Sequence, residues 1–467
     1  MTSPPDTSSQ TGTVPAPREP AEPGCGPFLL RDVELSETLP ALVSGVANRS
    51  LLLVRLFTEP LGLVEVPVPA GPAQIAGVVW EAFGDNVNQR VAAAGGDPLD
   101  ALPPEGVRVP GTVPWLAQRA EVLAAAPPIS VVLCTRDRAD RLTPCLDRLR
   151  GQFYPDFEIV VVDNAPTTNA VRRLVTDMAD PRVRYALEPR PGLSRARNTG
   201  VAAARHGVVA FIDDDESADG YWLAEIARGF TASDRVGCVS GMILPAELET
   251  QPQLLFEEYG GHSKGRGFRR AVIDPADRSG QSPLYPLPPF GAGGNMAFTR
   301  AALGRIGGFD EALGAGTPAR GAEDTAAFSD VLLAGFRLVY QPSAFVRHTH
   351  YRTEAGLRTQ LYGYGLGLTA YYSRLLVRSP KQLPELIRLI PTAWRDTFGK
   401  DSIRSGHLPP DFTRKLLRDQ RRGMLRGPAA YVRSRRAERR GQVHGDGHAD
   451  RHAHGHGAAG GADAGAR

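Results

Sequence analysis

The sequence predicts an α/β fold with a mostly parallel central sheet, and three of its features support this prediction. Across residues 129–350 of the 467-residue chain, short apolar runs alternate with helical patterns, as in strands joined by crossover helices. The run 208–212 is apolar throughout, which suits a strand that is covered on both faces. It ends in four adjacent acids, 213–216, and open α/β sheets bind their ligands at the carboxyl ends of strands. We therefore expect a nucleotide-binding architecture.

The N-terminal part divides by composition into a tail and a small module. Residues 1–26 are rich in Pro, Thr, Ser and Glu, a composition typical of disorder. Residues 27–126 combine strand-like and helical patterns, which predicts a small accessory α+β module. Its predicted elements are two strands over 50–57 and 62–68, a helix over 73–94 and a linking helix over 113–126. The module contains no group of residues that predicts catalysis.

Residues 127–350 form the predicted central domain. Its strands are expected at 129–133, 157–162, 183–186, 208–212 and 337–340, and its helices at 138–149, 193–204 and 324–334. Polar residues follow the strands: Thr135, Arg136 and Asp137 after the first, and Asp163 after the second. Because the carboxyl ends of parallel strands meet at one edge, these side chains are expected to face one crevice. Ordinary turn chemistry is the alternative for Asp163.

The C-terminal part is predicted to be a helical, basic extension over 351–440, followed by a disordered tail over 441–467. The tyrosine-rich stretch 357–376 favours a helix that packs on the central domain. Arginine is dense across 404–440, which is compatible with a solvated basic helix or with peripheral contact to an anionic membrane surface. The tail is mostly Gly, Ala, Asp and His, which cannot form a core.

Charge and hydropathy exclude several classes of protein. A net charge of +3 is small for this length and does not indicate a nucleic-acid partner. No apolar run reaches the roughly 20 residues needed to span a bilayer, and no early segment resembles a signal peptide. We therefore expect a cytoplasmic protein, with peripheral membrane contact as an addition. The glycine-rich segments lack the spacing of a phosphate loop or of a dinucleotide fingerprint, which disfavours a dehydrogenase.

The acids 213–216 predict a metal site. Adjacent carboxylates repel one another unless a cation or hydrogen-bond donors compensate their charge. Hard oxygen ligands suit Mg²⁺ or Mn²⁺, and these ions in turn bind phosphates. The alternative is an acidic loop that caps the next helix, since Asp is favoured at helix starts.

Four motifs, in this order, resemble the nucleotide-binding half of family 2 glycosyltransferases, which share the GT-A fold. They are ISVVLCTRDR (129–138), EIVVVDN (158–164), GLSRARNTG (192–200) and FIDDD (211–215). Three further motifs resemble the acceptor half of the same family: GGNMAF (293–298), GGFDE (307–311) and GAED (321–324). The resemblance covers about half of the chain. It implies a GT-A domain that binds a nucleoside-diphosphate sugar and a hydroxyl acceptor.

The resemblance implies a base pocket for the donor. Asp163 would contact the nucleoside base, and Arg197 would approach the same base or its phosphates. Thr135, Arg136 and Asp137 would line this pocket. For Arg197 the alternative is a solvated helix arginine.

The resemblance also implies a metal-binding group. Asp213 would be the acid on the ribose side, and Asp215 the acid that holds Mn²⁺ or Mg²⁺ on the diphosphate. Asp214 is the ambiguous middle member. His348 resembles a histidine that family members place near the metal or the diphosphate, although a lone histidine is often structural.

On the acceptor side the resemblance makes Asp324 the catalytic base, with Glu323 and Asn295 as acceptor-side residues. The expected mechanism is a single displacement with inversion, in which Asp324 takes the proton of the attacking hydroxyl. The alternative is that Glu323 and Asp324 are acidic residues of a helix N-terminus, where the helix dipole stabilises negative charge. The family often has Gly before this acid pair, whereas this chain has Ala322.

Two other functions are compatible with the same motifs. One is a scaffold or carbohydrate-binding protein that keeps the fold without transfer, because fold alone does not establish activity. The other is a sugar nucleotidyltransferase, which also places acids and a metal on an α/β sheet. Retention of both the base and the metal acid favours the transferase. These motifs leave open the donor sugar, its base and the acceptor, which could be a saccharide, a lipid carrier or a natural product.

Overall fold

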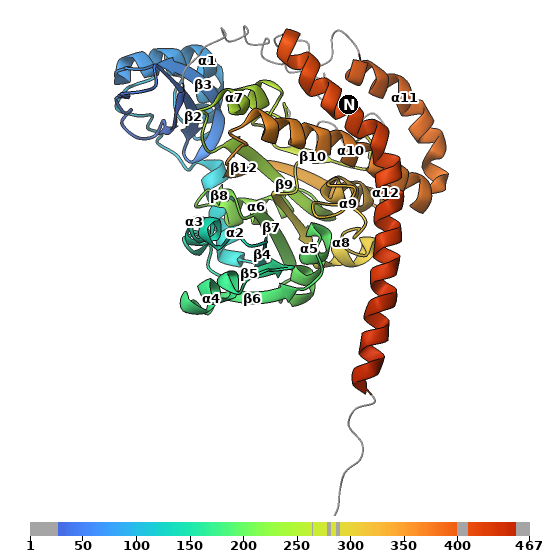
Figure 1. Cartoon of the computed structure of the whole chain (residues 1–467). Helices are drawn as coiled ribbons and strands as arrows, with labels where there is room; N and C mark the ends of the chain where they lie inside the picture. Colours follow the sequence, from blue (N-terminus) through green and yellow to red (C-terminus); the bar gives the residue numbers. More distant parts are fainter. Residues whose placement is uncertain (1–26, 264, 278–281, 286–289, 399–409, 454–467) are drawn as a thin grey trace, which may run out of the picture.

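The computed structural model describes residues 27–263, 265–277, 282–285, 290–398 and 410–453. Within them the chain forms a small three-stranded sheet, a large nine-stranded sheet and a group of C-terminal helices (Figure 1). The predicted fold class is confirmed, since the large sheet is mixed but mostly parallel and is flanked by helices. The segment 1–26, for which the sequence predicts disorder, lies outside the described residues.

The N-terminal module is a three-stranded sheet that packs against one long helix. Its strands are β1 (Phe28–Glu34), β2 (Arg49–Leu56) and β3 (Glu59–Pro67), and its helices are α1 (Pro72–Ala93) and the linking α2 (Pro114–Ala125). β1 runs parallel to β2, and β2 runs antiparallel to β3. Ile75, Val79 and Val87 of α1 are buried in the core of the module, on one face of the helix. The structure confirms both predicted strands and both predicted helices, and adds β1.

The parallel half of the large sheet contains four predicted strands. β4 (Ile129–Thr135), β5 (Phe157–Asn164), β6 (Val183–Glu188) and β7 (Val208–Asp213) lie in the order β7-β4-β5-β6. Neighbouring residues alternate between two apolar layers, so Val131 and Leu133 belong to one layer and Val132 to the other. Helices α3 (Ala139–Arg150), α4 (Ala170–Asp177) and α6 (Trp222–Phe230) contribute to the first layer. Helices α5 (Leu193–Ala203), α8 (Arg300–Ile306) and α9 (Glu323–Leu333) contribute to the second.

The other half of the large sheet is mixed. Its strands are β8 (Glu216–Ala218), β9 (Val236–Pro245), β10 (Ala271–Ile273), β11 (Asn295–Thr299) and β12 (Arg337–His348). β11 runs antiparallel between β7 and β9, while β12 runs parallel to β9. The helix α7 (Gln251–Glu258) follows β9. Of these five strands, the sequence predicts only the start of β12.

The C-terminal part is helical, as predicted. Its elements are α10 (Glu354–Arg378), the short 3₁₀ helix η1 (Pro380–Gln382), α11 (Leu383–Phe398) and α12 (Pro410–Ala453). Helices α10 and α12 cross at glycines, because a Cβ at Gly365 or Gly423 would collide with the backbone of the other helix. Helix α12 runs into the segment 441–467, for which the sequence predicts disorder, and the remainder of that segment lies outside the described residues.

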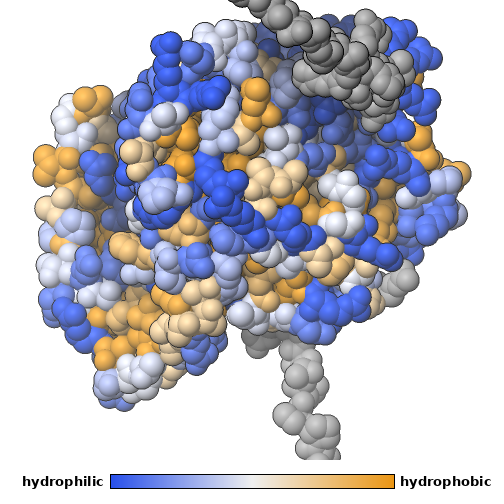
Figure 2. Space-filling view, turned by 90° about the horizontal axis from the view of Figure 1, so that it is seen from below, coloured by the Kyte–Doolittle hydropathy of each residue, from blue (hydrophilic) through white to orange (hydrophobic). Residues whose placement is uncertain are grey.

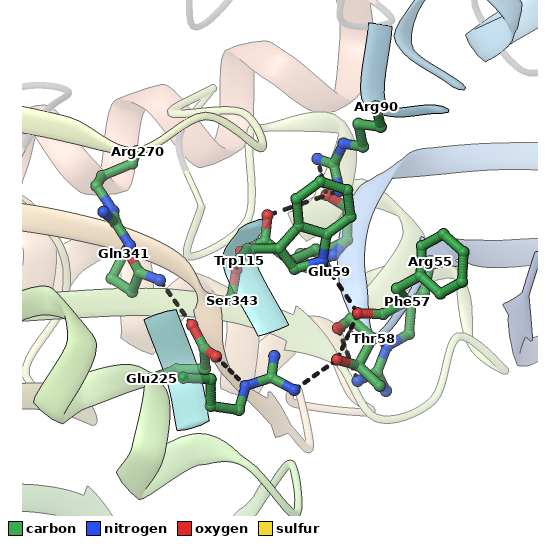
Figure 3. A network of polar contacts seen from close by, with 12 residues as sticks. Arg55, Phe57, Thr58, Glu59, Arg90, Trp115, Glu225, Arg270, Gln341 and Ser343 are labelled. Atoms are coloured by element: carbon green, nitrogen blue, oxygen red, sulfur yellow. Dashed lines mark hydrogen bonds and ion pairs between the residues drawn. The ribbon is translucent and has the colours of Figure 1, made fainter. Parts of the chain in front are cut away.

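A buried polar network fastens the N-terminal module to the central domain (Figure 3). Arg119 of α2 donates to Glu225 of α6 at 2.6 Å, and Gln341 of β12 donates to the second oxygen of the same carboxylate at 2.7 Å. Arg228 of α6 pairs with Glu59 of β3. Burial opposes ionisation of Glu59, but Arg228, together with Arg90 and Arg270, outweighs this effect and lowers the pKa of Glu59. The module is therefore tied by charged groups to α6 and β12, which are elements of the large sheet and its covering layer.

Helix α11 carries an exposed apolar stripe. On the face seen in Figure 2, hydrophobic patches are separated by hydrophilic side chains. In α11, apolar residues recur at helical spacing, and Leu383, Ile387, Ile390 and Trp394 are 47%, 57%, 57% and 65% exposed. Among the described helices, none combines the length and the apolar character that crossing a membrane requires.

Candidate functional site

A cavity of about 1280 Å³ opens at the carboxyl ends of β4 and β7. The acids after β7 form one side of it, the first turn of α9 forms another, and the end of β12 and one face of α10 complete the wall. The predicted site residues in its lining are Thr135, Arg136, Arg197, Asp213, Asp214, Asp215, Glu323, Asp324 and His348. The structure therefore brings the predicted donor-side and acceptor-side acids into one space.

Asp214 is the structural member of the acidic run. It is buried, and its two carboxylate oxygens accept from Thr135 Oγ1 at 2.7 Å and from Arg138 Nη1 at 2.9 Å. These contacts tie the acidic run to the end of β4 and the start of α3. Because both oxygens are already engaged, Asp214 is less suited to bind a ligand than its two neighbours.

Asp213, Asp215 and Glu216 bring together negative charge that the nearby arginines only partly offset. Burial raises the pKa of all three carboxyl groups, and the neighbouring acids raise it further. Arg138 lies 3.6 Å from Asp215 and only partly offsets this effect. A divalent cation would relieve the repulsion, since it favours the ionised form of each acid. The residues therefore fit Mg²⁺ or Mn²⁺, as the sequence predicts.

His348, the last residue of β12, faces the same acids. Its Nε2 lies 3.7 Å from Asp215 Oδ1, a separation at which both atoms can bind one ion. Burial and the neighbouring His350 lower the pKa of His348 to about 4. A neutral imidazole is the form that binds metals, so the surroundings keep His348 ready for that role.

Arg197 links the donor side of the cavity to the acceptor side. Its side chain is 2% exposed, donates to Glu323 Oε1 at 2.7 Å and to the Gly293 carbonyl at 3.0 Å, and lies 3.4 Å from Asp213. Burial opposes its charge, but Glu323 and Asp213 raise its pKa above the usual value. The solvated helix arginine is therefore excluded, and the guanidinium is held between two acids of the site.

The acid pair at the start of α9 separates into two roles. Burial outweighs the contact with Arg197 and raises the pKa of Glu323 to about 7. Asp324 is half-buried, and its Oδ1 accepts the N–H of Thr325 at 2.6 Å. Its other oxygen makes no hydrogen bond within the described residues. Asp324 therefore offers a free carboxylate oxygen to the cavity, whereas Glu323 is engaged by Arg197.

Ala322 explains why glycine suits the position before this acid pair. It is the residue before the first turn of α9, with φ 68° and ψ 16°. This left-handed conformation is unfavourable for a residue with a Cβ. The chain therefore carries local backbone strain next to Asp324.

Three predicted site residues lie outside the cavity lining. Asn295 is fully buried in β11, donates to the carbonyls of Met242 and Ala344, and accepts from Trp222 Nε1. The expectation of an acceptor-side role for Asn295 is therefore corrected: its amide is fully used in joining β9, β12 and α6 around β11.

The other two are acids from the predicted base pocket. Asp137 accepts the N–H of Thr167 at 2.8 Å and so fastens the loop after β5, outside the cavity. Asp163 is fully buried beside Tyr185, whose hydroxyl donates to it at 3.1 Å. Its second oxygen, Oδ1, has no hydrogen-bond partner among the described residues. Asn164, the next residue, does line the cavity.

The cavity includes residues that the sequence did not single out. Arg138 and Arg141 add positive charge beside the acids, and Tyr259 and Tyr364 add aromatic surface on the side of α10. Glu216 packs so closely against Gly294 that a Cβ there would collide with its carboxylate. The density of acids after β7 was the available signal for Glu216, and the tyrosine-rich stretch 357–376 was the signal for Tyr364, whereas nothing local marks Tyr259.

Comparison with known proteins identifies the sheet domain. Residues 130–307 match the model of the glycosyl transferase family 2. The chain is 24% identical over 238 residues to the glucosyl-dolichyl phosphate glucuronosyltransferase of Haloferax volcanii, covering 48% of this chain and 71% of that protein. It is 27% identical over 264 residues to the pre-mycofactocin glycosyltransferase of Mycobacterium tuberculosis, covering 56% and 50%.

Two further matches are shorter or more distant. An uncharacterized glycosyltransferase of Nostoc is 33% identical over 112 residues. This match covers 23% of this chain and 34% of that relative. A mannosyltransferase of Pyrobaculum calidifontis, solved in complex with GDP-Man and Mn²⁺, shares 20% identity with a TM-score of 0.43, covering 69% of this chain and 93% of that one. The family expected from the motifs is confirmed: through residues 130–307, the chain belongs to glycosyl transferase family 2.

Proposed function

We propose that the protein transfers a sugar, with inversion, from a nucleoside-diphosphate sugar to an acceptor hydroxyl. The observation that carries this proposal is that one cavity is lined both by the acids after β7 and by Asp324. Inverting transfer needs a cation-binding group for the leaving diphosphate and one carboxylate for the attacking hydroxyl, and it needs no protein nucleophile. Both parts face the same space here.

On the donor side, Asp215 and His348 would hold Mn²⁺ or Mg²⁺, and Asp213 would lie toward the ribose. The metal, when bound, would neutralise charge that develops on the departing diphosphate. Arg136 and Arg138 bring further positive charge to this side of the cavity. Asp163 would recognise the nucleoside base only after its buried side chain is uncovered toward the cavity, which its neighbour Asn164 already lines. Its buried Oδ1, which has no partner among the described residues, supports this assignment because such an atom calls for a donor.

On the acceptor side, Asp324 would act as the base. The N–H of Thr325 orients its carboxylate, and the remaining oxygen can accept the proton of the attacking hydroxyl. Glu323 would instead hold Arg197, which keeps a positive charge under the donor site. The tyrosines on the α10 side offer aromatic faces of the kind that pack against an acceptor.

The proposal is tested by calorimetric titration of UDP, GDP and dTDP, with and without Mn²⁺, followed by transfer assays with sugars of the nucleotide that binds. We expect one nucleotide to bind in a metal-dependent manner, and we expect Asp215→Ala to abolish this binding. Asp324→Asn should bind the same nucleotide and lose transfer. Folded protein that binds none of the three nucleotides would contradict the proposal and favour a scaffold, and joint consumption of a sugar 1-phosphate and a nucleoside triphosphate would favour a nucleotidyltransferase.

We also propose that the C-terminal helices contact an anionic membrane surface, where a lipid-carried acceptor would be found. The relative from Haloferax volcanii acts, by its name, on a glucosyl-dolichyl phosphate. The exposed stripe of α11 ends in Trp394, and the exposed cations Lys381, Arg388 and Arg395 lie near it. Apolar burial together with basic flanks is the pattern of an interfacial helix.

Vesicle binding tests this contact. The wild type should sediment with phosphatidylglycerol-containing vesicles, and Ile387→Ser with Ile390→Ser should reduce sedimentation, whereas the matched changes Val43→Ser with Val46→Ser in the N-terminal module should not. Brominated lipids should quench the fluorescence of Trp394, which Trp394→Phe would identify by difference. Equal sedimentation of the wild type and the α11 variant with the vesicles would contradict this proposal.

A further inference from the structure

A chain of two polar contacts stands behind His348. The Nδ1 atom of His348 lies 3.0 Å from Nδ1 of His350, and Nε2 of His350 lies 2.7 Å from Oε1 of Glu257. Glu257 belongs to α7, which is 93 residues away from His350 in the sequence. We propose that His350 and Glu257 are positioning residues that set the tautomer and orientation of His348 for metal binding. This inference rests on the proposed function, in which Asp215 and His348 hold the metal.

We call the chain His348–His350–Glu257 the relay, and hydrogen-bond chemistry determines which atom donates at each of its two contacts. As a carboxylate, Glu257 can only accept, so Nε2 of His350 must donate to it. A neutral His350 then has its lone pair on Nδ1, which accepts from Nδ1–H of His348. His348 is left with its lone pair on Nε2, the atom that lies 3.7 Å from Asp215 Oδ1. The relay therefore presents a metal-binding nitrogen to the acidic run.

Packing holds the relay in place. The side chain of His350 is 1% exposed, and the ring of Phe256 meets it edge to face at 4.8 Å between centroids. The same phenylalanine packs edge to face against His262 at 5.0 Å. Because Phe256 and Glu257 are neighbours in α7, one turn of this helix supplies both the acceptor and the apolar wall. A metal-bound histidine in proteins is commonly oriented in this way, through its second nitrogen and a carboxylate.

A different arrangement of the same histidines would have a different chemical result. The potential ligand atoms of His262, His348 and His350 all lie within 4.8 Å of one another, so three imidazoles could surround an ion directly. An ion bound to Nδ1 of His348 would leave the proton on Nε2, the atom that faces Asp215. This nitrogen could then no longer bind an ion held by the acidic run. The contact between His350 and Glu257 fits either arrangement, so the dependence of ion binding on Asp215 separates them.

Titration of Mn²⁺, followed by the paramagnetic resonance of the free ion, tests the relay without donor, acceptor or turnover. The wild type should bind one ion, and Asp215→Ala and His348→Ala should lose it. His350→Ala and Glu257→Ala should each weaken Mn²⁺ binding by about 10–100-fold. Glu257→Gln keeps an acceptor oxygen and should restore most of the affinity. Asp100→Ala, an exposed acid in the N-terminal module, is the matched control and should have no effect.

The outcomes distinguish failure of the relay from failure of the proposed function. If Asp215→Ala abolishes binding while the Glu257 and His350 variants keep the wild-type affinity, the relay is wrong and the metal site stands. If Asp215→Ala leaves binding intact, the proposed metal site is wrong. If a bound ion survives Asp215→Ala but is lost in His350→Ala, the histidines bind metal themselves, which overturns the relay. If His350→Ala does not fold, the comparison of Glu257→Ala with Glu257→Gln still decides.

A second measurement reports the tautomers directly. In metal-free protein labelled with ¹⁵N-histidine, we expect His348 to carry its proton on Nδ1 and His350 to carry it on Nε2. Assignment of the two rings follows from the signals lost in His348→Asn and His350→Asn. In Glu257→Ala the preference of both rings should weaken together. A proton on Nε2 of His348 in the wild type would contradict the relay.

Discussion

The crossing of α10 and α12 allows a sharp prediction, because two glycines of α10 that are two residues apart have opposite surroundings. A Cβ at Gly365 would lie 2.8 Å from the carbonyl carbon of Gln420 in α12, and closer still to its oxygen. A Cβ at Gly363 would meet no atom within 4 Å in the described part of the chain. Both positions belong to one helix, so the difference between the two alanine variants reports the crossing rather than the helix.

The magnitudes follow from two opposing terms. Replacing Gly with Ala inside a helix stabilises it by about 1 kcal/mol, and at Gly363 this gain is unopposed. At Gly365 the overpacking costs about 1–3 kcal/mol, and the upper part applies because the obstructing atoms are backbone. The expected net effects are a stabilisation of about 1 kcal/mol for Gly363→Ala and a destabilisation of about 1–2 kcal/mol for Gly365→Ala.

Thermal unfolding of both variants, followed by circular dichroism, measures the difference. The melting temperature should rise in Gly363→Ala and fall in Gly365→Ala, by about 2 °C for each kcal/mol in a chain of this size. The helical signal of the folded state should be unchanged in both, which is the control for local unfolding. Shifts of both variants in the same direction would refute the close crossing.

Four further predictions concern the cavity and the module. Ala322→Gly should raise the free energy of unfolding by about 1 kcal/mol or less in urea titrations, because it removes a Cβ from a left-handed conformation, while glycine also gains freedom in the unfolded chain. The free energy of unfolding of the wild type should fall as pH rises through about 7, because the pKa of Glu323 is about 7 in the folded chain and 4.5 in the unfolded chain, so only the folded state still holds the proton. Glu323→Gln should lack this part of the decline between pH 5 and pH 8. An identical decline in the wild type and the variant would contradict the assignment. Asp324→Asn should lower kcat by about 10²–10⁴-fold while nucleotide affinity, measured by calorimetry, stays within about twofold. Arg119→Ala should cost about 3 kcal/mol in the same urea titrations, because it removes one partner of the fully buried Glu225, and an unchanged midpoint would show that the network contributes no stability.

The parallel half of the sheet could be predicted from the sequence because its strands are nearly continuous apolar runs. β5 and β7 are buried on both faces, and burial on both faces leaves this pattern. β9 is equally buried, but its sequence, VGCVSGMILP, includes two glycines and a serine and gives no clear period. β11 has only five residues and runs antiparallel, so neither its length nor its neighbours could be deduced.

The site could be predicted where a residue's role depends on its place at a strand or helix end. Asp215 and Asp324 meet this condition, and both line the cavity. Asn295 does not, because the three groups that occupy its amide come from distant parts of the chain. The contact between His350 and Glu257 was beyond sequence reasoning for the same reason, since only the folded chain brings α7 to the end of β12.

Strand β12 has a consequence for how the chain can be divided. Gln341 and Ser343, in its middle, contact Glu225 and Glu59 at the module interface, while His348, at its end, lines the cavity. A fragment that begins at residue 127 would remove Arg119 and Glu59, the partners of Glu225 and Arg228 in α6, and would expose these charges to water. Residues 27–126 therefore cannot be removed without breaking buried ion pairs to the central domain. Grafting experiments should therefore carry the residues of α6 and β12 that contact this module together with it.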